Sequence, residues 1–212
     1  MANVDAPFGL RPVGELGAGI QNGGTTRYPI EDNLTQPIYK GDLVYVSDGT
    51  VQDTGASASP AKGTIGASAN ANVMSIGVFN GCFVTKHPTT GKPFWSNYYP
   101  GAINVASGEY IWGFVYDDPN KLFEVQASGS LTNPTSIGSN VDYAWTAGST
   151  INGQSKAELG SAIVASGATG TFVIIGLSTD PDNSDAGSAN ANWIVRLNEG
   201  RYLKTTLTTS FP

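Results

Sequence analysis

The sequence is poor in the residues that carry most enzymatic chemistry. Its 212 residues include one histidine, His87, and one cysteine, Cys82. A site built on several histidines is therefore excluded, and so is a disulfide within the chain. Charged residues make up only 13% of the chain, about half of their share in an ordinary soluble domain. We therefore predict a protein that is not an enzyme and that needs no cofactor.

Basic residues and long apolar runs are also scarce. The chain has 11 Lys and Arg against 17 Asp and Glu, a formal net charge of −6. Proteins that bind a phosphate backbone need a basic face, so we expect no nucleic-acid partner. No apolar run approaches the ~18 residues of a membrane-spanning helix, and residues 1–10 lack the regions of a signal peptide. We expect no membrane contact and synthesis in a cytoplasm.

What the sequence does contain is a series of short strand patterns separated by turn residues. Val141, Tyr143 and Trp145 alternate with other residues at the period of two that is typical of a half-buried strand. The run 110–116 is apolar on both faces and stops at Asp117, which predicts a central strand buried on both sides. Such patterns recur every ~10 to 15 residues, and helix signals are nearly absent. We predict an all-β fold, a jelly-roll-like sandwich or barrel.

The N-terminal residues have a different character. Prolines and glycines are scattered through residues 1–27 without a sustained period, which predicts an extended N-terminal arm. A β-sandwich domain is expected over 28–212, with 128–139 as the candidate position for a subdivision. Spaced apolar side chains in an extended arm suit a sheet edge or a neighbour's groove, and a frayed terminus is the alternative. The predicted partner-binding anchors of the arm are Val4, Phe8 and Leu10.

Four other features have a structural interpretation that we prefer to a chemical one. His87 lies in a polar turn, and Cys82 lies among apolar neighbours that favour a buried structural thiol over a nucleophile. Residues 180–185 resemble the start of a calcium loop, but Asp185 stands where that loop requires glycine. A solvated turn is the preferred interpretation, and a weak Ca²⁺ site is the alternative. The acidic pair 117–118 precedes a proline and is interpreted as a turn.

An aromatic block at 94–100 is the most informative segment for function. Tryptophan and tyrosine rings beside Asn and Ser have three interpretations that the sequence leaves open. They could pack in the core, form the centre of a protein interface, or stack on a sugar ring. The predicted interface patch consists of Trp95, Tyr98 and Tyr99.

Segments spread over nearly the whole chain resemble one known family. They are 1–14 (MANVDAPFGLRPVG), 77–83 (GVFNGCF), 92–101 (KPFWSNYYPG), 114–119 (FVYDDP), 123–126 (FEVQ), 176–183 (GLSTDPDN) and 191–198 (ANWIVRLN). The family comprises structural proteins of tailed bacteriophages of aquatic bacteria. The resemblance implies a capsid decoration, or cement, protein that is β-rich, oligomeric and without catalysis. It carries no functional residue over to this chain.

These expectations combine into one functional prediction. The protein would decorate the outer face of an icosahedral phage head as a homotrimer, with the major capsid protein as its partner and the virion as its location. Weak contacts of three linked copies would add up through multivalency. The alternative is a carbohydrate-binding or host-attachment β module of the virion.

Overall fold

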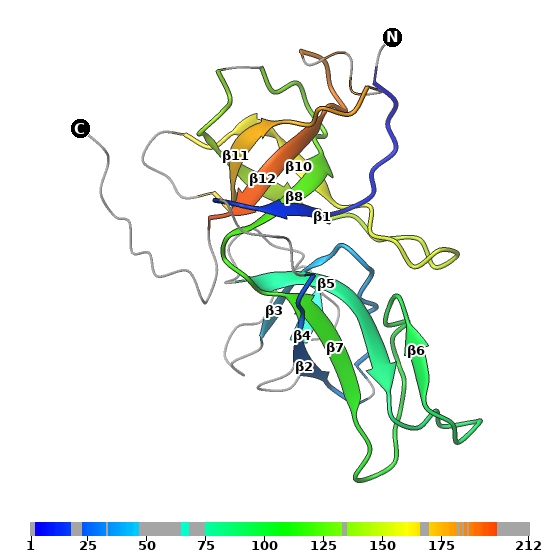
Figure 1. Ribbon diagram of the computed structural model, residues 1–212. Coiled ribbons are helices and arrows are strands. Elements are labelled where there is room, and N and C mark those ends of the chain that lie inside the picture. Colours follow the sequence, from blue (N-terminus) through cyan, green and yellow to red (C-terminus); the bar gives the residue numbers. More distant parts are fainter. Residues whose placement is uncertain are drawn as a thin grey trace.

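The chain folds into β-strands that form two antiparallel sheets (Figure 1). The computed structural model describes residues 3–17, 23–32, 34–46, 65–67, 75–132, 135–165, 170–181, 183, 185 and 187–198. The strands in these residues are β1 (Arg11–Glu15), β2 (Thr26–Ile30), β3 (Leu43–Val46), β4 (Ile65–Ala67), β5 (Ser75–Val84), β6 (Phe94–Ser96), β7 (Ile111–Tyr116), β8 (Lys121–Gln126), β9 (Asn140–Ala144), β10 (Glu158–Ile163), β11 (Phe172–Leu177) and β12 (Asn192–Leu197). The predicted all-β fold is confirmed. The described residues form no helix long and apolar enough to traverse a bilayer.

Sheet A has six strands in the order β1-β8-β12-β11-β9-β10. It curls back on itself, because a parallel bridge joins Ala127, just after β8, to Leu159 of β10. The N–H of Ser128 also donates to the carbonyl of Leu159 at 3.1 Å. The predicted alternation of β9 is confirmed, since Val141 and Tyr143 face the core inside this curl. The other core side chains on these strands are Phe123, Val125, Phe172, Ile174, Trp193, Val195 and Leu197.

Sheet B has six strands: five follow the order β2-β7-β5-β3-β4, and the sixth, β6, pairs with the C-terminal half of β5. Its inner face and the loops beneath it enclose a second apolar cluster. That cluster consists of Ile30, Leu34, Ile38, Val44, Ile76, Phe79, Cys82, Val84, Tyr99, Ile103, Val105, Ile111 and Val115. Cys82 is therefore a buried thiol, as the sequence predicts.

The two sheets are joined through a shared core. Leu43 of β3 and Val78 of β5 belong to sheet B but pack with the core side chains of sheet A, and Tyr116 of β7 packs beside them. The backbone N–H of Leu43 donates to the Tyr143 hydroxyl at 3.2 Å. Sheet A thus covers one end of the outer face of sheet B (Figure 1).

The chain crosses from sheet B to sheet A at the turn 117–120, between β7 and β8. The N–H of Lys121 donates to the carbonyl of Asp118 at 3.1 Å, so the acidic pair does form the predicted turn. The stretch 128–139 connects β8 to β9, which both belong to sheet A. The change of sheet therefore falls earlier in the chain than the candidate subdivision.

The predicted arm contributes strands to both sheets. Residues 3–10 are extended, β1 is the end strand of sheet A on β8, and β2 begins at Thr26 as the end strand of sheet B. Each of these end strands contains a proline, Pro12 in β1 and Pro29 in β2. Proline has no N–H to donate, so within sheets it is confined to such edges.

Candidate functional site

The outer face of sheet B carries a group of partly exposed aromatic rings. Along β7 the side chains of Ile111 and Val115 face the core on either side of the buried Gly113, and those of Trp112 and Phe114 face the opposite way. The prediction of a strand buried on both sides is therefore wrong for this end of β7. Among the described residues, sheet A packs on the outer face near Tyr116, and Trp112 and Phe114 farther along β7 are partly exposed.

Neighbouring strands extend this group across the sheet. Phe83 of β5 lies opposite Trp112 on one side and opposite Trp95 of β6 on the other. Directly paired residues of antiparallel strands have their side chains on the same face. Tyr110 joins them by stacking on Trp112, with ring centroids 5.5 Å apart. We call this surface the aromatic face, and it consists of Phe83, Trp95, Tyr110, Trp112 and Phe114.

Contacts within the aromatic face hold the rings in place. The rings of Trp95 and Phe114 have centroids 4.7 Å apart. The Arg27 guanidinium lies 5.3 Å from the centroid of the Trp112 ring. The Trp95 ring packs closely against β5 because residue 81 is glycine. A Cβ at residue 81 would be 3.2 Å from the Trp95 ring and 2.8 Å from the Ser96 carbonyl oxygen. Trp95 and Tyr110 nevertheless remain 55% exposed, and contiguous exposed apolar surface marks a binding site.

The predicted interface patch is divided by the structure. Trp95 belongs to the aromatic face, whereas Tyr99 is fully buried and donates its hydroxyl to the Leu34 carbonyl at 2.8 Å. Burial raises the pKa of Tyr99 to about 12. Tyr98 is half-buried and stacks on Tyr39 with 5.8 Å between ring centroids. Of the three predicted residues, Tyr99 is therefore a core residue and Trp95 is the exposed one.

Sequence reasoning missed most of the aromatic face. The apolar run 110–116 predicts a doubly buried strand and so places Tyr110, Trp112 and Phe114 in the core. The available signal was the alternation of large aromatic rings with Ile, Gly and Val in that run. In the structure the Ile, Gly and Val positions of that run are buried, and the aromatic positions between them are partly exposed.

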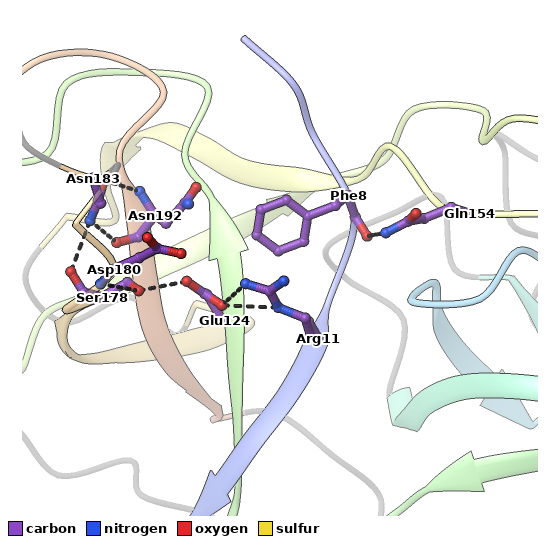
Figure 2. Close-up of polar contacts among 8 residues, drawn as sticks. All are labelled: Phe8, Arg11, Glu124, Gln154, Ser178, Asp180, Asn183 and Asn192. Atoms are coloured by element: carbon purple, nitrogen blue, oxygen red, sulfur yellow. Dashed lines mark hydrogen bonds and ion pairs between the residues drawn. The ribbon is translucent and has the colours of Figure 1, made fainter. Parts of the chain in front are cut away.

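A second surface holds the N-terminal residues against sheet A (Figure 2). We call residues 3–16 the strap. The side-chain amide of Gln126 bonds to the backbone of the strap at two residues. The amide oxygen accepts the N–H of Ala6, and the amide nitrogen donates to the Val4 carbonyl, both at 3.0 Å. The Gln154 side chain donates to the Phe8 carbonyl at 3.2 Å.

Arg11 fastens the strap to β8. Its guanidinium donates to Oε2 of the Glu124 carboxylate, and the distance from Arg11 Nε to that oxygen is 3.0 Å. The Ser178 hydroxyl donates to the other carboxylate oxygen at 2.5 Å. The Arg11 guanidinium also lies 4.9 Å from the centroid of the Phe8 ring. The buried Glu124 carboxylate is thus neutralised by a residue of the strap (Figure 2).

The three predicted anchors lie in different surroundings. Val4 is 74% exposed, Phe8 is half-buried beside Arg11, and Leu10 is 2% exposed within the core of sheet A. Leu10 is therefore occupied by the chain's own core, and of the three only Val4 is free to contact another molecule.

The remaining sequence candidates have structural partners. Burial raises the pKa of the Cys82 thiol to about 12, which disfavours the thiolate that a nucleophile needs. The His87 Nδ1 accepts backbone N–H groups of its own turn, from Thr89 at 3.1 Å and Thr90 at 3.3 Å. Asp117 accepts the hydroxyl of Tyr28 at 2.8 Å, which ties β2 to the end of β7.

The segment that resembles a calcium loop, residues 180–185, is held by hydrogen bonds of the Asn183 side chain. Asn183 donates to the carbonyls of Ser178 and Asn192 and accepts the N–H of Asn192 at 2.9 Å (Figure 2). Asp182 lies outside the described residues. Within the described part of the chain, no three His, Cys, Asp or Glu side chains gather as a metal site would require.

Comparisons of the chain with models of protein families, with curated proteins and with solved structures found no match.

Proposed function

We propose that the protein is a non-catalytic structural protein of a phage virion that decorates the outer face of an icosahedral capsid as a trimer. The observation that carries a binding role is the aromatic face of sheet B, where Trp95 and Tyr110 are each 55% exposed. The resemblance of segments across the chain to phage structural proteins supports the virion as the setting. The major capsid protein is the proposed partner.

The chemistry of the aromatic face suits a protein interface. Tryptophan, tyrosine and arginine are the residues most enriched among those that dominate binding energy, and the face combines Trp95, Tyr110 and Trp112 with Arg27 at its border. Each contact with a capsid subunit need not be tight, because three linked copies bind as one unit.

A carbohydrate-binding or host-attachment role is the second candidate. The same face supports it, because partly exposed Trp95 and Trp112 rings on one sheet surface offer flat apolar planes for sugar rings. The two candidates differ in the ligand and not in the surface.

Co-sedimentation with phage heads that lack the protein separates these candidates. Saturation at a fixed stoichiometry in the hundreds of copies per head would support decoration and identify the symmetry axis. Saturation at a dozen copies or fewer would move the protein to a vertex, collar or tail. Absence of binding to heads, together with binding to host polysaccharide on a glycan array, would replace the capsid proposal with the carbohydrate one.

Substitutions on the aromatic face test its part in the same assay. The double variant Trp95→Ala, Trp112→Ala should weaken binding to heads by at least about tenfold, because loss of a central aromatic residue removes roughly 2 kcal/mol or more. Ile163→Ala is the matched control, since Ile163 is 42% exposed and lies on β10, an end strand of sheet A. Equal binding by both variants would show that the aromatic face is not the contact surface.

A further inference from the structure

We propose that the strap is exchanged between copies of the chain, so that residues 3–16 of one copy occupy the β8 surface of another. The partner is a second copy of this protein, and the contacts are those that the strap makes in the single chain. The proposal does not depend on a capsid, because it concerns association of the chain with itself.

The first argument is that, among the described residues, those outside the strap that bond with it are far from it in the sequence. Asn3 donates to the Asp185 carbonyl at 2.8 Å, and Val4 and Ala6 bond with Gln126. The nearest partner along the chain is Gly41, whose carbonyl accepts the N–H of Leu10 at 2.9 Å. None of these contacts depends on the covalent attachment of the strap to this particular copy, so a strap from a neighbour would satisfy the same groups.

The second argument is the length of the connection that follows the strap. Glu15 at the end of β1 pairs with Lys121, and Thr26 at the start of β2 pairs with Val115. These partners are joined by the turn 117–120, so the two ends of the connection are held near one turn. Residues 17–25 join the strap to β2, and nine residues can extend to about 30 Å. The connection is therefore longer than it needs to be to join the end of β1 to the start of β2 within one chain.

The third argument is that the β8 surface is unfavourable when it is empty. Without a strap the Glu124 carboxylate, which is 4% exposed, would lose the Arg11 guanidinium. The Gln126 amide would lose its bonds with Ala6 and Val4 and keep the one to the Asn190 carbonyl. The apolar side chain of Leu10 would also leave the core. Buried polar groups without partners are destabilising, so the surface stays filled by a strap from the same copy or from a neighbour.

Exchange between identical copies conserves these contacts and is a recognised route to oligomers. It converts a weak contact between copies into a tethered one, because each exchanged strap holds its neighbour at a high effective concentration. Contacts through the aromatic face or another surface then need to contribute little free energy of association to favour the assembly.

Disulfide trapping between two different full-length chains tests the exchange. Arg11 and Glu124 are directly paired across β1 and β8, at the Cα separation that a disulfide accepts. One chain carries Arg11→Cys and the other carries Glu124→Cys, both with Cys82→Ala, and they are mixed in denaturant, refolded together and oxidised. We expect a covalent heterodimer on a non-reducing gel, at least about tenfold more abundant than in a control mixture that pairs Arg11→Cys with Ile151→Cys.

A single chain with both substitutions shows whether the pair is competent. If that chain closes its disulfide internally while the mixture gives no more heterodimer than the control, the exchange proposal is wrong. If it closes no disulfide at all, the strap does not lie on β8 and the proposal is equally wrong. The pair Glu15→Cys and Lys121→Cys, also directly opposite, repeats the measurement with Arg11 and Glu124 intact. Since no heads are present, neither result bears on capsid binding.

Discussion

At the scale of single residues, Asp42 is a carboxyl group fully enclosed where the strap, sheet A and sheet B meet. Its Oδ2 accepts the N–H of Tyr39 at 2.8 Å, and the N–H of Leu43, the next residue, donates to the Tyr143 hydroxyl. Burial disfavours the charged carboxylate and raises the pKa of Asp42 from 3.8 to about 7, although bonds from Ser155 and Tyr39 oppose the shift.

This shift predicts that the protein loses stability between about pH 4 and pH 7. In that range the folded chain keeps a proton on Asp42 that the unfolded chain has released. The free energy of unfolding therefore falls as pH rises, by up to about 1.4 kcal/mol per pH unit, and levels off above pH 7. Urea unfolding of the wild type and of Asp42→Asn at several pH values checks this. The difference between the two proteins should fall through the range, and a constant difference would contradict the assignment.

Gly9 is a second residue whose identity is fixed by its surroundings. Its φ is +72°, and a Cβ there would lie 2.5 Å from the Cβ of Ser155. Gly91 has a similar φ of +66°, and a Cβ at that position would have nothing within 4 Å. A substitution at Gly91 therefore measures the backbone strain alone, without the clash that Gly9 would have with Ser155. Gly91→Ala should lose about 1 kcal/mol of unfolding free energy, and Gly9→Ala should lose about 1–3 kcal/mol more. Equal losses in chemical denaturation would mean that the strap does not lie against Ser155.

At the scale of elements, the pairing of β1 with β8 depends on a buried ion pair. The Lys121 ammonium lies 3.2 Å from the Glu15 carboxylate, and the two side chains are 1% and 13% exposed. The ammonium also lies 5.5 Å from the centroid of the Tyr116 ring. A buried charge that loses its partner is more destabilising than the pair was stabilising.

The ion pair therefore predicts an asymmetry between substitutions on the two strands. Glu15→Ala should lose about 3 kcal/mol of unfolding free energy because it leaves the ammonium buried without a counter-charge. Lys121→Met should lose less, since it removes the more deeply buried charge and keeps the aliphatic stem. The double variant should be more stable than Glu15→Ala alone in urea titration. Additive losses in this double-mutant cycle would show that the two side chains do not interact.

The elements also show how far the sequence pattern could be interpreted. The alternation at Val141 and Tyr143 predicts the inward face of β9 correctly, because that strand has one face in the core and polar residues on the other. The same reasoning fails on β7, where both faces are apolar but only Ile111 and Val115 face the core. Hydropathy does not separate an apolar side chain that is buried in the core from one that is partly exposed on the outer face.

The strap was predictable only in part. The sequence of residues 1–27 predicts its extended form. It leaves a sheet edge, a neighbour's groove and a frayed terminus as alternatives, and it does not identify the edge. The bonds of Arg11 to Glu124 and of Ala6 to Gln126 join residues more than a hundred positions apart. Contacts of this kind depend on strand order, which single-sequence patterns do not contain.

At the scale of the whole molecule, the two sheets are joined by buried contacts. Leu43 and Val78 of sheet B lie in the core of sheet A, and the Leu43 N–H donates to Tyr143. Disrupting one sheet therefore exposes part of the other core.

This shared core predicts that both sheets unfold in one cooperative transition. In denaturant-dependent hydrogen exchange followed by mass spectrometry, the amides of β5 and those of β11 should lose protection together. Tyr143→Phe should lower the stability of both sheets by about 1–3 kcal/mol, because it leaves the buried Leu43 N–H without an acceptor. Exchange of β5 at a denaturant concentration where β11 is still protected would show that the sheets are independent units.

The prolines of the two end strands affect how copies of the protein associate when they are packed close together. Pro12 in β1 and Pro29 in β2 each interrupt the row of N–H groups that an incoming strand would need. The outer side of each of these strands is therefore a poor template for open-ended, fibril-like growth. A protein packed side by side at high local density can in this way keep its associations stoichiometric and avoid aggregation through these two edges.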